Sequence, residues 1–255
     1  MAKGFDCATP LTQAIAEAFV ADGMSIVARY LVPSGEKRLT KTEAEIINVA
    51  GLDIVSVFET TANRALGGRE AGLEDGAIAA QVAKQVGQPI GSCIYFAVDF
   101  DASAAQMATI IEYIRAASEA TPDYTTGVYG SYSVIQSVKV AGACSRFWQT
   151  YAWSRGQKAE GIHIYQFEND ITANGIGIDR DEVYDNEGAW NSLVKEIEPM
   201  LKVEDADLAI GLFQEAYRMG VTKITKPNGE IITVDQDKIH ELANAQRRAS
   251  GQPQE

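Results

Sequence analysis

Short apolar segments alternate with amphipathic segments along most of the chain, up to about residue 190. Apolar runs of roughly four to eight residues are typical of buried strands, and apolar residues spaced three and four apart are typical of helices. The alternation therefore predicts parallel strands joined by crossover helices. We expect eight strands, at Gly4–Ala8, Ser25–Leu31, Asp53–Glu59, Cys93–Asp99, Thr126–Tyr129, Arg146–Tyr151, Gly161–Phe167 and Ile176–Asp179.

The intervening segments predict helices, with weaker signals after the sixth and seventh strands. They lie at Leu11–Ala21, Thr42–Ala50, Arg69–Val86, Ala104–Ala120 and Ser133–Val140. Thr40 or Thr42, and Asp101 or Ser103, are candidate N-caps. The glycine-rich segments Gly67–Gly72 and Asn174–Asp179 are predicted to be loops. The fold class is α/β, and a TIM-like (β/α)8 barrel is the favoured architecture, with a doubly wound open sheet as the alternative.

The pattern changes after Glu198-Pro199. Residues 1–198 are expected to form the barrel, and residues 199–255 a small C-terminal α+β module. This module is predicted as a helix, a hairpin turning at Asn228-Gly229, and a second helix, with the last residues disordered. It could bind the cell wall, dock onto a partner, form a homodimer or pack back onto the barrel.

Composition excludes several classes of protein. The 22 Lys and Arg residues against 35 Asp and Glu residues give a formal charge of -13, which disfavours nucleic acid as a partner. Three scattered cysteines form no metal-binding pair, and Cys7 has no nearby histidine motif to activate it. Two histidines, His163 and His240, are too few for a histidine-rich zinc site, and they offer little material for a Ser-His-Asp triad. No metal or cofactor is expected.

The chain has no run of 18 apolar residues, so membrane insertion is not expected. Its N-terminus lacks the charged and then apolar stretch of a signal peptide. We therefore expect cytoplasmic synthesis of a soluble protein. A substrate outside the membrane would require a holin, cell lysis, non-classical export or a signal missing from this sequence.

Acidic residues stand at the ends of four predicted strands: Asp6, Glu59, Asp99 with Asp101, and Asp179. The carboxyl ends of parallel barrel strands form one rim, so these carboxyls are expected to converge there. Strand alternation would place Asp99 and Asp101 on the same face. Crowded carboxyls differ in pKa, which supplies the acid and the base that glycosidic cleavage requires. The alternative for each aspartate is a helix cap.

Aromatic and amide side chains accompany the acids and form the candidate substrate-binding set, together with Asp179. They are Tyr30, Tyr129, Tyr132, Trp148, Tyr151 and Gln166. Aromatic rings stack on sugar faces, and their polar ends can bind hydroxyl groups. Packing in the core or at the rim is the alternative for each ring.

Seven motifs in order (GFDCAT, ARYL, SVFET, IYFAVDFD, GVYGSY, FWQTYAW and IYQF) resemble a glycoside-hydrolase-like barrel family of unsettled activity that is related to the family 25 lysozymes. The resemblance covers about Lys3 to Asp185. It implies that Asp101 is the proton donor, with Asp99 as its partner and Asp6 and Asp179 at the other acidic positions. The chain has D-x-D where the lysozymes have D-x-E, which shortens the donor by one methylene, and Glu59 could supply the missing reach.

The leading hypothesis is a muramidase-type peptidoglycan hydrolase, an endolysin or autolysin. Asp101 would be the acid, Asp99 and Asp6 stabiliser or base, and Glu59 the reserve donor. The alternative is a non-catalytic glycan-binding barrel at the cell wall, which the D-x-D motif favours. A hydrolase of another polysaccharide is the third hypothesis. The expected partner in each case is a carbohydrate, with peptidoglycan first.

Overall fold

The computed structural model describes residues 2–184, 187–193, 211, 214–215, 218, 223–225, 231–233, 243–245 and 247. The chain divides into two units, Met1–Leu193 and Val194–Glu255. The division falls a few residues before the predicted boundary at residue 198.

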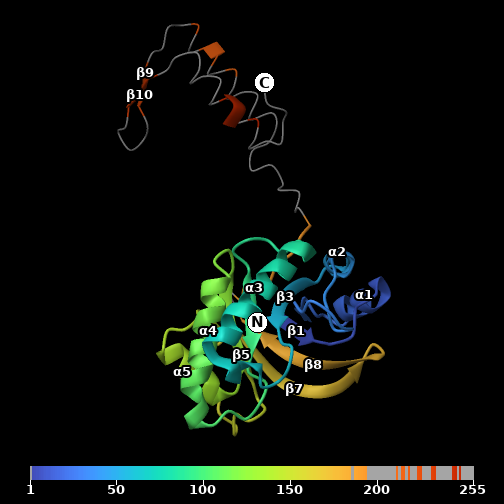
Figure 1. Cartoon of the computed structure of the whole chain (residues 1–255). Helices are drawn as coiled ribbons and strands as arrows, with labels where there is room; N and C mark the ends of the chain where they lie inside the picture. The colour runs from blue at the N-terminus through green and yellow to red at the C-terminus, as the bar shows by residue number, and fades with distance from the viewer. Residues whose placement is uncertain are drawn as a thin grey trace. The chain divides into compact units, whose positions relative to one another are not determined.

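The first unit is a closed eight-stranded barrel in which the strands follow one another in chain order (Figure 1). The strands are β1 (Ala2–Asp6), β2 (Ile26–Tyr30), β3 (Asp53–Phe58), β4 (Cys93–Ala97), β5 (Thr125–Gly130), β6 (Arg146–Thr150), β7 (Ile164–Ala173) and β8 (Ile176–Val183). The pairings from β1 to β7 are all parallel. The predicted TIM-like barrel is confirmed.

Helices cover the outside of the barrel between the first six strands. They are α1 (Gln13–Ala21), α2 (Lys41–Ala50), α3 (Gly68–Val86), α4 (Met107–Ala120) and α5 (Tyr132–Val140), with 3-10 turns at Arg64–Gly67 and Ala104–Gln106. Thr40 caps α2 by accepting from the Glu43 amide. Ser103, and not Asp101, caps the turn before α4, in a reciprocal box with Gln106. The alternative role of Asp101, as a helix cap, is therefore excluded.

The eighth strand runs in the opposite direction to that expected, since β8 is antiparallel to both β7 and β1. The chain reverses at Asn174 (φ 49°) and Gly175 (φ 82°), the left-handed pair that a tight two-residue hairpin requires. The predicted strand at Ile176–Asp179 is confirmed as part of β8, so the overlapping loop prediction for Asn174–Asp179 holds only for its first two residues. The hairpin tip lies against the end of α1, where Asn174 donates a hydrogen bond to Asp22 (2.9 Å) (Figure 1).

The predicted loop at Gly67–Gly72 is also wrong, because α3 begins at Gly68. The glycines allow α3 to approach α4 closely. A Cβ atom on Gly72 would lie 2.2 Å from the Tyr113 carbonyl oxygen, and one on Gly76 would lie 2.8 Å from the Ala117 carbonyl oxygen. The absence of side chains at these two positions sets the separation of the two helices.

Alternation along the strands creates two cores. Outward residues pack beneath the helices, as in the stacked rings of Phe5 and Phe19 (centroids 3.9 Å apart). Inward residues fill the barrel, with Tyr95 and Trp148 in an edge-to-face contact. Residues 187–190 return to the amino end of the barrel, where Trp190 exchanges two backbone hydrogen bonds with Ile54 (2.8 Å each). This packing leaves the carboxyl end for the functional site.

In the second unit, β9 (Lys223–Thr225) pairs antiparallel with β10 (Ile231–Thr233), which confirms the strands of the predicted hairpin. The Asn228-Gly229 turn and the last residues lie outside the described residues. The two predicted helices of this unit are described only at isolated positions.

Candidate active site

A small cavity of about 90 Å³ lies at the carboxyl ends of the barrel strands. It brings together most of the residues expected at the site: Asp6, Glu59, Asp99, Asp179, Tyr30, Tyr129, Trp148 and Gln166. The register explains the convergence, because Asp6 at the end of β1 pairs directly with Asp179 near the start of β8. Asp99 and Glu59 follow β4 and β3 at the same rim.

Gln166 joins two of the carboxyls. Its Nε2 donates to Asp6 Oδ2 (2.8 Å) and to Asp179 Oδ2 (3.1 Å). Its Oε1 accepts from the hydroxyls of Tyr129 (2.9 Å) and Thr150 (2.8 Å). Every hydrogen-bonding atom of this buried amide is satisfied, so the network fixes the spacing of the two acids. The contribution of Thr150 was not anticipated from the sequence.

Asp181 lies beneath Asp6, inside the barrel, and is 4% exposed. It accepts a hydrogen bond from Trp148 Nε1 (2.9 Å), and its carboxyl is also hydrogen-bonded to that of Asp6. The sequence analysis missed this residue. The signal was present, because Asp179 and Asp181 are two positions apart on one strand and therefore share its inward face.

Burial raises the pKa of Asp6 to about 8, and the negative charge of Asp179 adds to the effect. Burial and the neighbouring Asp6 raise the pKa of Asp181 well above its usual range. Burial also raises the pKa of Asp99 and of Asp179. The raised pKa favours the protonated form of Asp6 although this carboxyl lines the cavity.

Lys37 brings a positive charge to the part of the cavity formed by β2 and the end of β3. Its Nζ lies 3.5 Å from Glu59 Oε2 and 4.3 Å from the centre of the Tyr30 ring. Burial raises the pKa of Glu59 and of Asp99, and the Lys37 ammonium opposes that rise in both. The cavity thus combines a buried carboxyl of raised pKa, Asp6, with a cation close to Glu59. Sequence analysis did not identify Lys37.

Three expected site residues lie outside the cavity. Strand β4 ends at Ala97, so strand alternation no longer aligns Asp101 with Asp99, and Asp101 is exposed in a neighbouring hollow. Tyr132 begins α5 and packs against the outer core. Tyr151 is 41% exposed and donates to Asn169. The expected sharing of one face by Asp99 and Asp101 is wrong for this geometric reason.

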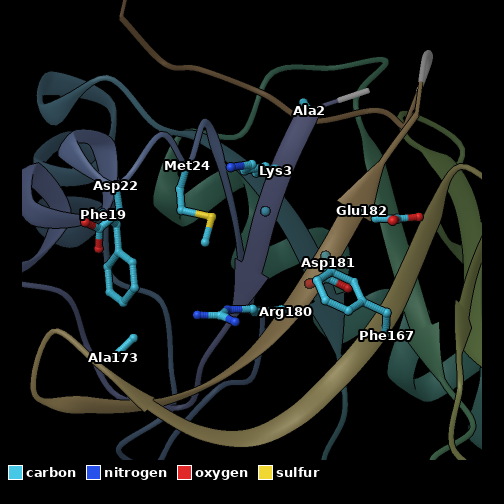
Figure 2. A pocket seen from close by; sticks show the side chains of 11 residues that line it. Ala2, Lys3, Phe19, Asp22, Met24, Phe167, Ala173, Arg180, Asp181 and Glu182 are labelled. Carbon is cyan, nitrogen blue, oxygen red and sulfur yellow. The ribbon is translucent and has the colours of Figure 1, made fainter.

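A larger hollow of about 640 Å³ lies against the outer side of β1 and β8, beside α1 (Figure 2). The β7–β8 hairpin occupies the place of a connecting helix and leaves this wall uncovered. Phe19, Met24 and Arg180 face the hollow, and Arg180 is already paired with Glu168 (2.9 Å). It contains none of the expected site residues. We therefore assign the functional site to the smaller cavity, where the carboxyls converge.

Other chemistries have little support in the described part of the chain. Burial raises the pKa of the Cys7 thiol to about 12, so it is a poor nucleophile. Among the described residues, no group of three or more His, Cys, Asp and Glu side chains is arranged to hold a metal ion. No described helix has the length and apolar character needed to cross a membrane.

The closed barrel and its acidic mouth define a glycoside-hydrolase-like protein. Residues 17–183 match the family described as Rv2525c-like, glycoside hydrolase-like domain, and the chain belongs to that family. The Tat-secreted protein Rv2525c of Mycobacterium tuberculosis, solved with L-tartrate, is similar at 25% identity and a TM-score of 0.67. That match covers 74% of this chain and 98% of the other.

Two further similar proteins each match this chain over only part of their own length. The uncharacterized protein YbfG of Bacillus subtilis is 31% identical over 167 residues, which are 55% of this chain and 22% of that protein. This chain therefore corresponds to a small part of that relative. The modular autolysin LytC of Streptococcus pneumoniae, solved with a synthetic peptidoglycan ligand, matches at 11% identity with a TM-score of 0.50, over 71% of this chain and 46% of LytC.

Proposed function

We propose that the barrel is a muramidase-type glycoside hydrolase that cleaves peptidoglycan at the cell wall. One observation carries the proposal: a buried carboxyl whose pKa is raised, Asp6, shares a cavity with two carboxyls near the Lys37 ammonium, Glu59 and Asp99. Carboxyls whose environments separate their pKa values are the requirement for acid and base roles in glycosidic cleavage. The autolysin LytC, whose structure holds a peptidoglycan ligand, shares the fold.

In this mechanism Asp6 transfers its proton to the glycosidic oxygen as the bond from that oxygen to the anomeric carbon breaks. The Asp99 carboxylate stabilises the positive charge that develops on the sugar. Water then adds to the anomeric carbon and gives its proton to Asp99. Asp101, which the family resemblance makes the donor, lies outside the cavity, and Asp6 takes that role here.

The test is reducing-end release from purified peptidoglycan by the wild type, Asp6→Asn, Asp99→Asn and Asp101→Asn. We expect Asp6→Asn and Asp99→Asn to lose about a hundredfold or more in rate, the usual contribution of general acid-base catalysis. Asp101→Asn should lose much less. Asp123→Asn is the matched control, because its carboxylate is exposed, pairs with Lys84 (3.1 Å) and precedes β5, at the end of the barrel opposite to the site.

Circular dichroism must show that each variant is folded. Activity of the wild type should also fall as pH rises through about 8, where Asp6 loses its proton. A folded wild type that releases no reducing ends from several cell walls, beside an active control lysozyme, refutes the proposal. So does an Asp6→Asn variant that is as active as Asp123→Asn.

A second candidate is a non-catalytic glycan-binding barrel. Two observations favour it: the lysozyme-like donor position, Asp101, lies outside the cavity, and the cavity volume of about 90 Å³ is below the roughly 300–1,000 Å³ of typical ligand pockets. Titration with peptidoglycan fragments, followed by product analysis, separates the candidates. Tight binding with intact fragments supports the binding barrel, and cleaved fragments support the hydrolase.

A further inference from the structure

A second cavity of about 400 Å³, here called the rim cavity, is built from the segments after β4 and β6 and the start of α5. Its lining comprises Asp101, Ala102, Ser103, Ala104, Met107, Ser133, Ser137, Trp153, Ser154, Arg155 and Gln157. Ala102 and Met107 are apolar, and most of the other side chains are hydroxyls or charged groups. The same strands carry Asp99, Tyr129 and Trp148 into the central cavity, so the two cavities share one end of the barrel.

The segment after β6 is held rigidly by Ser154, which is 2% exposed. The Ser154 hydroxyl donates to the Thr150 carbonyl oxygen (2.5 Å) and accepts from the Tyr132 amide (2.9 Å) and from Gln149 Nε2 (3.3 Å). The neighbours of Ser154 in sequence, Trp153 and Arg155, are both exposed in the rim cavity. The buried serine therefore presents an aromatic ring and a cation at fixed positions.

Both presented residues have a backbone conformation that their side chains disfavour. Trp153 has φ 53° and Arg155 has φ 51°, in the left-handed region where bulky residues are rare. Such conformations persist where the surrounding structure imposes them, and they cluster at functional sites. Here the Ser154 network imposes them on the two residues that carry the chemistry of this segment.

The charges of the rim cavity lack ion-pair partners in the described part of the chain. Neither Arg155 nor Asp101 lies within ion-pair distance of an opposite charge there. Among the described residues, the cavity thus offers one cation and one anion without ion-pair partners, together with serine hydroxyls and an indole that is 37% exposed. A neutral sugar would use neither charge, whereas a short peptide with a carboxylate and an amino group would use both.

We propose that the rim cavity binds the peptide substituent of the glycan, with Arg155 on a peptide carboxylate and Asp101 on the side-chain amino group of its diamino acid. This inference rests on the proposed function, because it names the part of peptidoglycan that lies beside the cleaved bond. Trp153 would cover the apolar side of the peptide, and the serine hydroxyls would bind its amides. The substrate class is then a peptide-bearing glycan, in preference to a bare polysaccharide.

The experiment is calorimetric titration of the full chain with two probes: the synthetic stem peptide N-acetyl-L-Ala-γ-D-Glu-L-Lys-D-Ala, whose acetyl group stands for the link to the glycan, and the peptide-free sugar chitotetraose. We expect Arg155→Gln and Asp101→Asn each to weaken stem-peptide binding about tenfold, the effect of losing one charge-assisted hydrogen bond. Chitotetraose binding should not change in Arg155→Gln. Arg69→Gln, which removes an exposed arginine paired with Glu119 on the outer helices, is the matched control.

The fluorescence of Trp153 gives a second measurement. Stem peptide should change the emission of the wild type, and Trp153→Phe should lose that change. The inference is overturned if the wild type does not bind the peptide, or if Arg155→Gln binds it as tightly as Arg69→Gln. Arg155-dependent peptide binding without glycan cleavage would refute the hydrolase and keep the inference. Cleavage without Arg155-dependent binding would refute the inference alone.

Discussion

Replacement of Asp6 by Asn should change how the stability of the barrel depends on pH. The pKa of Asp6 rises from 3.8 to about 8 on folding, because the carboxyl is buried beside Asp179. A raised pKa means that the folded chain binds a proton that the unfolded chain has lost. The resulting stabilisation is fully present below pH 3.8 and is lost as pH rises through about 8.

The magnitude follows from this linkage. Between pH 5 and pH 7, Asp6 is ionised in the unfolded chain and protonated in the folded chain, so each pH unit lowers the free energy of unfolding by about 1.4 kcal/mol. Asn does not titrate. We therefore expect the stability of Asp6→Asn relative to wild type to increase by about 3 kcal/mol from pH 5 to pH 7.

The assay is urea unfolding at pH 5, 6 and 7, followed by tryptophan fluorescence. All three tryptophans, Trp148, Trp153 and Trp190, lie in the barrel unit, so the signal is independent of the C-terminal unit. Asp123→Asn, which removes an exposed carboxylate, should follow the wild type at each pH. If the free energy of unfolding of Asp6→Asn changes with pH as it does in the wild type, Asp6 is ionised in the folded protein and the proposed acid role fails.

Two further predictions concern Lys37 and the contact of α3 with α4. Lys37→Met should raise the pKa of Glu59 and Asp99, because it removes the ammonium that lowers the pKa of both carboxyls. NMR titration of the carboxyl carbon shifts measures these pKa values, and Lys41→Met is the control that should leave them unchanged. Equal pKa values in the two variants would refute the role of Lys37. Gly72→Ala should destabilise the barrel by roughly 1–3 kcal/mol, since its Cβ would lie 2.2 Å from the Tyr113 carbonyl oxygen. Gly177→Ala is the control, because a Cβ atom at Gly177 would have no atom within 4 Å, and this variant should unfold near the wild-type urea concentration. Equal losses of stability in Gly72→Ala and Gly177→Ala would contradict the packing argument.

The acidic residues whose positions could be predicted from the sequence are those at the ends of parallel strands. Asp6, Glu59 and Asp99 lie at or just beyond the carboxyl ends of parallel strands, and such ends form one rim in any barrel of this class. Asp179 was assigned to the same rim and reaches it from an antiparallel strand, through its pairing with Asp6. The predicted position of Asp179 is thus confirmed, but the reason differs: the prediction assumed the carboxyl end of a parallel strand, and the structure shows antiparallel pairing with β1.

The features that sequence analysis missed depend on chain direction and loop path. Asn174-Gly175 is a hairpin signal, and its recognition would have reversed β8 and pointed Asp181 into the barrel. Lys37 reaches the cavity through a loop that returns to β2 at the Tyr30–Arg38 bridge, which no periodicity predicts. Asp101 was misplaced because β4 ends at Ala97, a boundary that an apolar run does not define.

The pairing of Asp6 with Asp179 also has a consequence for how the site is formed during synthesis. These two carboxyls belong to the first and last strands of the barrel, and they meet when β8 closes the ring against β1. A nascent chain that has not yet released β8 from the ribosome has no Gln166 bridge to Asp179 and no Asp181 beneath Asp6. The raised pKa of Asp6 thus depends on the completed ring, because β8 supplies both Asp179 and part of the burial that raises it.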